Sequence, residues 1–284
     1  MGSALIGLAG KGLNVNKYSL TGGSFAYNWK SSQGYAWYQR VLAAGADISP
    51  LNQPVFDTAF QSIYSNSTIS GAIAQTGFLI GFKDGSGGAG SAINGCFVPI
   101  VGNTPINHGF VSSDFNPLRG LLGDGSKYID LNRRNGVDGN NKHIQVGYYQ
   151  RVGSQALMGS GINTGDSILL SSGNPNAALS SLTSPSFVRN VSTTNFSSFG
   201  LNRDNSVTQV RAYSGTGTGS ATQYADSYSP ASNSPTYLFA DPSFTYSNFS
   251  GYIFYYSMGT SMGGSGQGLI ALAGIMNTLA LGLT

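Results

Sequence analysis

Apolar positions recur with two different periods along this chain of 284 residues, and the period changes near residue 90. In the first part, Trp37, Arg40, Val41 and Ala44 follow helical spacing and stop at Gly45. Because many helices end at a glycine, this pattern predicts a helix that ends there. In the second part, short runs alternate between apolar and polar residues, which is typical of strands.

Two further segments of the first part carry helix signals. A second helix is predicted to begin near Pro54, because proline is favoured in the first turn of a helix. Its apolar stripe consists of Phe56, Phe60, Ile63 and Tyr64. The apolar run 69–80 is compatible with a third, shorter helix. The glycine-rich segment 83–90 is interpreted as a linker or a long turn.

The second part is predicted to be a series of strands separated by clusters of turn-forming residues. The expected strands lie at 96–101, 117–122, 127–132, 142–150, 155–160, 166–171, 186–191, 196–201, 207–213, 236–240 and 250–257. The stretch 214–234 consists almost entirely of small and polar residues with tyrosine, and it is interpreted as a hairpin and a long surface loop. Loops of this kind often carry recognition.

Both ends of the chain are apolar. Residues 1–33 are rich in glycine and are interpreted as an extended arm that docks on a neighbouring subunit. The segment 267–283 is apolar nearly all round but falls short of the roughly 20 residues that span a membrane, so we expect a helix at the sandwich surface or at a subunit interface, without membrane insertion. The expected organisation is an arm at 1–33, a helical segment and linker at 34–90, and a β-sandwich with a C-terminal helix at 91–284.

Composition supports a β protein with a real core. Only 9% of the residues are charged, and the eleven acids are all aspartate, without one glutamate. Glutamate is a good helix former and the usual residue of exposed helical faces, so its absence argues against a helical bundle or a coiled coil. The 40% of hydrophobic and 12% of aromatic residues argue against disorder.

The missing glutamates also restrict the chemistry. Sandwich-fold glucanases use a pair of glutamates, and the nearest substitute here is Asp124 with Asp130. Asp124 lies in a Gly-Asp-Gly-Ser turn, where its side chain is expected to bond to its own backbone. Hydrolysis is therefore disfavoured, and we expect no enzyme activity.

Other catalytic and metal-binding patterns are missing as well. His108 and His143 are the only histidines, and neither lies near a nucleophile-elbow motif. The single cysteine, Cys96, lies in an apolar run and is expected to be a buried, inert thiol. Neither a zinc pattern nor a calcium loop occurs, so no metal or cofactor is expected.

The basic residues give weak support for a nucleic-acid partner. Arg133, Arg134, Lys142 and Arg151 are close in the sequence, and the sequence pI is about 8.9. With a net charge of only +3, that pI reflects the scarcity of acids more than a basic face. We expect no nucleic-acid binding.

The first residues show no secretory pattern, so assembly in a cytoplasm is expected.

Several strings of the sandwich segment resemble one family. The runs 120–133 (GLLGDGSKYIDLNR) and 251–259 (GYIFYYSMG), the latter followed by an apolar helix, are similar to the concanavalin A-like (laminin-G-like) sandwich of tailed-phage virion proteins. The runs 98–105 (VPIVGNTP) and 110–115 (FVSSDF) resemble entry strands of the same family. The resemblance covers about residues 34–284 and identifies no active site.

The resemblance implies a mainly β fold, an antiparallel two-sheet jelly-roll sandwich, in a structural protein of a phage virion. Such a subunit, of a tail fibre, a baseplate or a capsid decoration, is expected to pack against other virion proteins and against copies of itself, usually as a homotrimer. A carbohydrate-binding module for host-surface glycan is the alternative, and a glycosidase that uses Asp124 and Asp130 is a third. The candidate glycan contacts are Tyr213, Tyr224, Tyr228 and Tyr237.

Overall fold

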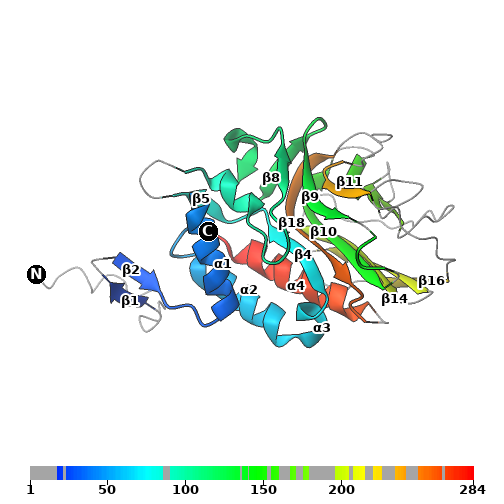
Figure 1. The fold of residues 1–284 in the computed structure, drawn as a ribbon, viewed down its shortest axis with the longest axis horizontal. Coiled ribbons are helices and arrows are strands. Elements are labelled where there is room, and N and C mark those ends of the chain that lie inside the picture. The colour runs from blue at the N-terminus through cyan, green and yellow to red at the C-terminus, as the bar shows by residue number, and fades with distance from the viewer. Residues whose placement is uncertain are drawn as a thin grey trace, which may run out of the picture.

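The structure of the protein is a computed structural model, which describes residues 18–21, 24–85, 90–134, 136–139, 141–151, 155–159, 167–170, 175–178, 196–204, 207–214, 220–225, 234–240, 249–263 and 266–284. This part of the chain is mainly β, with several antiparallel sheets and few helices (Figure 1). The fold class that the alternating pattern predicts is therefore confirmed at this level.

The larger sheet holds eight strands. Its path is β16-β15-β14-β10-β18-β8-β7, and β4 joins it by pairing with β18. In that order the strands span Ser220–Ala225, Val207–Ser214, Ser197–Asp204, Lys142–Arg151, Ser250–Thr260, Gly120–Asp124, Phe115–Asn116 and, for β4, Ile73–Phe78. Every pairing is antiparallel. The long strand β18 is central, because it pairs with β10, β8 and β4.

The smaller sheet holds six strands in the order β13-β12-β11-β17-β9-β6. In that order the strands span Pro175–Ala178, Ser167–Leu170, Gln155–Gly159, Pro235–Leu238, Tyr128–Arg134 and Ile106–His108. Ile129 and Leu131 of β9 and Leu238 of β17 belong to the same hydrophobic core as the strands of the larger sheet. The two sheets therefore share one core.

Strand β10 of the larger sheet is covered on both faces. Ile144 and Val146 point into the core, whereas the intervening Gln145 points to the opposite face, where its Nε2 donates to the carbonyl oxygen of Leu269 at 2.8 Å. Leu269 belongs to α4 (Gln267–Gly282), the C-terminal helix expected from the apolar run 267–283. Helix α2 (Gln53–Ser65) lies beside α4 (Figure 1).

The helices of the first part begin and end close to the expected residues. Helix α1 spans Ser32–Ala43, and Gly45 follows it with a φ of 83°, a left-handed conformation that favours glycine. Ser31 begins the helix by accepting the backbone N–H of Gly34 at 3.0 Å. The second expected helix is α2, with Pro54 in its first turn. Both helix predictions are confirmed.

Part of the predicted arm forms a hairpin that stands apart from the rest of the described chain. Strands β1 (Tyr18–Thr21) and β2 (Ser24–Tyr27) pair antiparallel and extend away from the sheets and helices (Figure 1). The arm joins the body at Asp57 of α2, which accepts the Tyr27 hydroxyl at 2.9 Å and the Ser31 backbone N–H at 2.8 Å. Residues 1–17 lie outside the described part.

Three expectations about secondary structure are wrong. The run 69–80 contains only the one-turn helix α3 (Ser67–Ser70) and continues as strand β4, which is buried on both faces. The run 96–101 is not a strand, because Ala92–Phe97 forms a 3₁₀-helix. The first two residues of the expected linker 83–90 belong instead to strand β5 (Phe82–Asp84), which pairs with β3 (Ala46–Ile48), and residues 86–89 lie outside the described residues.

Most other strand predictions match an observed strand to within about three residues, and the expected strand 186–191 lies outside the described residues. The division into segments at 33 and 90 stays a prediction. Strand β4 comes before residue 90 and nevertheless pairs with β18 of the expected sandwich segment.

Candidate functional site

Three aromatic rings from three neighbouring strands form a row on the smaller sheet. They are His108 of β6, Tyr128 of β9 and Tyr237 of β17, and we call them the aromatic row. The register places His108 opposite Tyr128, and it places Tyr237 opposite Asp130, two residues further along β9. The sheet therefore brings together residues that lie far apart in the sequence.

The rings of the aromatic row are in direct contact. The centroids of His108 and Tyr128 are 4.3 Å apart, and the two ring planes differ by only 9°. The centroids of Tyr128 and Tyr237 are 4.8 Å apart, with an interplanar angle of 34°. Aromatic pairs at such distances attract each other and hold one another in a fixed orientation. Tyr128 is the central ring because it touches both of the others.

Strand alternation places the aromatic row on the outer face of the sheet. Ile129 and Leu238, each next to a member of the row in sequence, are fully buried in the core. Since successive side chains point to opposite faces, Tyr128 and Tyr237 point outward, and both are partly exposed. Ile106, on the same face of β6 as His108, is 47% exposed. The row is thus a partly open aromatic surface on the outer face of the sheet.

Charged side chains lie beside the row. Burial raises the pKa of Tyr237, and the negative charge of Asp130 raises it further, whereas Arg134 acts in the opposite direction. The phenol therefore keeps its proton at neutral pH. One oxygen of Asp130, Oδ1, accepts the backbone N–H of Asn132 at 2.7 Å, which fixes the carboxylate next to the rings. The surface combines a stack of aromatic rings with a hydroxyl donor and a carboxylate acceptor.

Of the four tyrosines predicted as glycan contacts, the three that lie in the described residues are divided between the two sheets. Only Tyr237 belongs to the aromatic row. Tyr213 and Tyr224 lie on β15 and β16 of the larger sheet, and Tyr228 lies outside the described residues. The register pairs Tyr213 with Ser198 and Tyr224 with Thr208. His108 and Tyr128 were missed, because their neighbourhood depends on strand pairing that the sequence does not display.

Asp124 and Asp130 have separate local roles. Asp124 Oδ1 accepts both the backbone N–H of Ser126 at 2.9 Å and its hydroxyl at 2.7 Å, which is the local turn bonding that the sequence predicts. Lys127 Nζ lies 2.9 Å from Asp124 Oδ2 and 2.8 Å from Asp114 Oδ1. These hydrogen bonds hold the pKa of Asp124 below its usual range. A catalytic acid needs the opposite shift.

A buried serine and a buried histidine form a hydrogen bond between strands β18 and β10 of the larger sheet. His143 Nδ1 lies 2.6 Å from the carbonyl oxygen of Thr260, which only accepts, so Nδ1 carries the proton. Nε2 therefore accepts from Ser257 Oγ at 2.9 Å, and Thr76 Oγ1 donates to Ser257 at 2.8 Å. This arrangement resembles an activated nucleophile, but all three side chains are fully buried and no substrate reaches them. The chain of hydrogen bonds joins β4, β10 and β18.

His143 makes the stability of the protein sensitive to pH. Burial lowers its pKa to about 4, from a usual value of 6.5. Above pH 6.5 the histidine is neutral in both states, whereas between pH 6.5 and 4 it takes up a proton mainly in the unfolded chain. We therefore expect the free energy of unfolding to fall by about 2 kcal/mol between pH 7 and pH 5.

Urea unfolding at pH 7 and at pH 5 measures this effect. The variant His143→Gln is the control, since it cannot take up the proton, and its stability should change much less over the same interval. Equal pH dependence of the two proteins would contradict the assignment.

Two of the basic residues named from the sequence, Arg133 and Lys142, are paired or buried. Arg133 forms an ion pair with Asp138, and Lys142 is buried, so these two do not belong to an open basic face. Cys96 is buried as predicted, and burial raises its pKa.

Among the described residues, no group of three histidine, cysteine or acidic side chains is placed to hold a metal ion. None of the described helices is long and apolar enough to cross a membrane.

Comparisons with known proteins do not assign the chain to a family. No protein-family model and no curated protein matches it. Among solved structures, domain 4 of the GH43 arabinanase AbnA from Geobacillus stearothermophilus aligns with 70% of this chain and 98% of its own, at 15% identity and a TM-score of 0.43. The binding domain of botulinum neurotoxin serotype D covers 67% of this chain and 48% of its own, at 11% identity and a TM-score of 0.45.

A phage protein is also among the similar structures. The enzymatically active domain of tailspike protein 2 from bacteriophage CBA120 aligns with 56% of this chain and 28% of its own, at 12% identity and a TM-score of 0.40. All three TM-scores are below 0.5, so no conclusion about this chain rests on these likenesses.

Proposed function

We propose that this chain is a structural subunit of a bacteriophage virion, in a tail fibre, a baseplate or a capsid decoration, and that it acts by packing against copies of itself and other virion proteins. The sandwich would be a concanavalin A-like jelly roll, and the assembly a homotrimer formed in the host cytoplasm. The observation that supports packing is the hairpin β1–β2, which extends away from the body (Figure 1). A two-stranded hairpin is at best marginally stable alone, so a partner surface would stabilise it.

The mass of the purified full-length chain tests the packing role. Light scattering is expected to give a closed oligomer, with three copies as the favoured number. A chain that remains a monomer over the whole accessible range of concentrations would contradict the proposal.

A second function, recognition of host-surface glycan, is favoured by the aromatic row. Sugar rings carry one face of C–H groups, which pack on aromatic faces, and a rim of hydroxyls, which bond to carboxylates and phenols. Tyr128 has a ring against each side, so Tyr237 at the end of the row is the ring that offers an aromatic face, and Asp130 lies directly beside it. The proposal therefore moves the glycan contact from the tyrosines of 213–228 to the outer face of the smaller sheet.

Binding to surface polysaccharide of the host cell tests the second function. The purified chain is expected to be retained on immobilised polysaccharide, and free polysaccharide should release it. A complete lack of retention for every fraction of the host surface would remove glycan recognition and leave the packing role in place.

The proposal includes no hydrolysis. Glycoside hydrolysis needs one carboxylic acid that stays protonated and a second carboxylate across the sugar. Asp124 is held ionised by Lys127 and Ser126, and Asp130 is bonded to the backbone of β9. Incubation with a bound polysaccharide should accordingly leave its length unchanged.

A further inference from the structure

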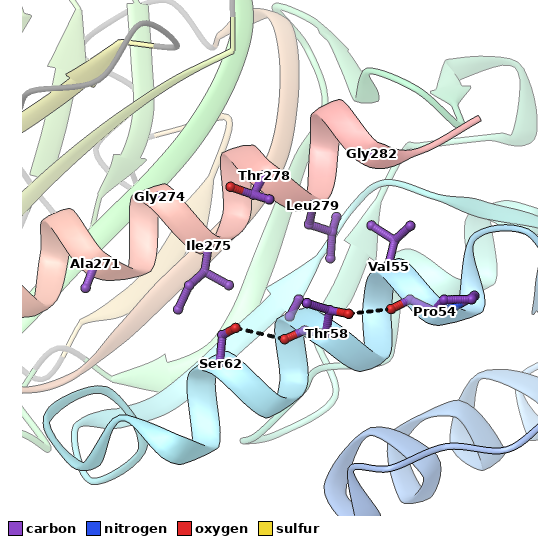
Figure 2. Close-up of a pocket in the computed structure, with 11 residues that line it drawn as sticks. Pro54, Val55, Thr58, Ser62, Ala271, Gly274, Ile275, Thr278, Leu279 and Gly282 are labelled. Atoms are coloured by element: carbon purple, nitrogen blue, oxygen red, sulfur yellow. Dashed lines mark hydrogen bonds between the residues drawn. The ribbon is translucent and has the colours of Figure 1, made fainter. Parts of the chain in front are cut away.

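The helices α2 and α4 enclose a groove. Its volume is about 590 Å³, and it is lined on one side by α2 and on the other by α4 (Figure 2). The lining residues are Pro54, Val55, Thr58, Ala59, Ser62, Ala271, Gly274, Ile275, Thr278, Leu279 and Gly282. Not one of them is charged. The groove is open because small side chains, such as Ala271 and Gly274, stand where larger ones would fill the space between the helices.

The hydroxyls of α2 in the groove already have partners. Thr58 Oγ1 donates to the carbonyl oxygen of Pro54 at 2.9 Å, and Ser62 Oγ donates to that of Thr58 at 2.9 Å (Figure 2). Because both hydroxyls bond within their own helix, they do not require a polar partner from outside. Together with Val55, Ile275 and Leu279, they form a wall that suits an uncharged, apolar occupant.

One segment of this chain fits that description. The first ten residues, MGSALIGLAG, contain Leu5, Ile6 and Leu8 among small residues and carry no charged side chain. Glycine and alanine allow a close approach to the backbone of the groove, and the larger side chains supply the apolar area. The segment precedes β1, whose hairpin leads away from α2 and α4 (Figure 1). The 17 residues before β1 span at most about 60 Å when extended, which sets how far beyond the hairpin the segment can reach.

We propose that the groove between α2 and α4 binds the N-terminal segment of a second copy of this chain. The inference rests on the proposed packing role and assigns that role a surface. Each subunit would give its own segment to one neighbour and receive one from the other, which is how a closed ring of identical contacts forms.

Directed cross-linking between two differently tagged copies tests the groove. One copy carries Leu8→Cys in the segment, and the other carries Ser62→Cys in the groove. The native Cys96 is buried with a raised pKa and does not compete. After mixing and mild oxidation, we expect a disulfide-linked pair that contains both tags. The control replaces the second copy by Gln39→Cys, which is exposed on α1 outside the groove, and should give at least tenfold less product.

A second variant separates blockage from misfolding. Ser62→Leu fills the groove with an apolar side chain. We expect this change to raise at least tenfold the concentration at which the oligomer dissociates. Urea unfolding of the same variant should show a folded subunit. Gln39→Leu should leave the dissociation unchanged. An oligomer of normal mass without the Leu8–Ser62 cross-link overturns the groove assignment and leaves the packing role standing, whereas a permanent monomer contradicts both.

Discussion

Replacing Trp37 by alanine is expected to lower the free energy of unfolding by about 4 kcal/mol. The indole is fully buried and lies within 5.1 to 6.0 Å, between ring centroids, of Phe56, Phe60, Phe78 and Phe82. Its N–H also donates to the carbonyl oxygen of Val98 at 3.0 Å. The substitution would leave a cavity at the junction of α1, α2 and β4 and an acceptor without its donor.

Urea unfolding at neutral pH measures this loss. Tyr35→Ala is the matched control, because Tyr35 lies on the same helix and is 51% exposed, so its removal should cost less than about 1 kcal/mol. Similar losses of unfolding free energy for the two variants would show that the aromatic cluster around Trp37 does not hold the junction of α1, α2 and β4 together.

Replacing Tyr128 by alanine is expected to weaken binding of the chain to host polysaccharide at least tenfold, about 1.4 kcal/mol of binding free energy. Tyr128 is the ring between His108 and Tyr237, so its removal interrupts the aromatic row and exposes a gap. The same change removes a cross-strand pair, with a cost to stability of about 1 kcal/mol or less. Binding and unfolding must therefore be measured on the same samples.

Two further variants separate the ring from other effects. Tyr128→Phe keeps the ring that supports Tyr237 and should retain most of the affinity, whereas Tyr35→Ala, on helix α1, should retain all of it. If Tyr128→Ala binds as tightly as the unchanged chain, the aromatic row serves only to stabilise the sheet.

Most of the secondary structure could be predicted from the sequence where one face of an element is buried and the other is not. In β9, the buried Ile129 and Leu131 alternate with the partly exposed Tyr128 and Asp130, and the predicted strand matches within two residues. Helix α4 could also be predicted, because an uncharged, apolar run of this length is typical of a buried helix. Local patterns determine such elements.

The errors occur where burial removes the pattern. Strand β4 is covered on both faces, so its apolar residues follow one another without alternation, and a run of that kind does not distinguish a strand from a helix. In the run 96–101, Cys96, Val98 and Ile100 are buried without joining a sheet ladder. Their apolar character reports burial and not the conformation of the backbone.

The candidate site could be predicted only in part, for a related reason. The density of tyrosines along the chain points to Tyr213, Tyr224, Tyr228 and Tyr237, and that assignment of glycan contacts stays a prediction. The aromatic row depends on the register of three strands, and its members lie up to about 130 residues apart in the sequence. A contact set by register is visible only in the folded chain.

The location of the chain in an assembled particle tests the central claim most directly. If the proposed virion role is right, cryo-electron microscopy of purified particles of a phage that encodes this chain should show it in several symmetry-related copies. In each copy, the outer face of the smaller sheet, with Tyr128 and Tyr237, should be turned toward solvent. Absence of the chain from purified particles would contradict the virion role, and an aromatic row covered by a neighbouring subunit would contradict its part in adhesion.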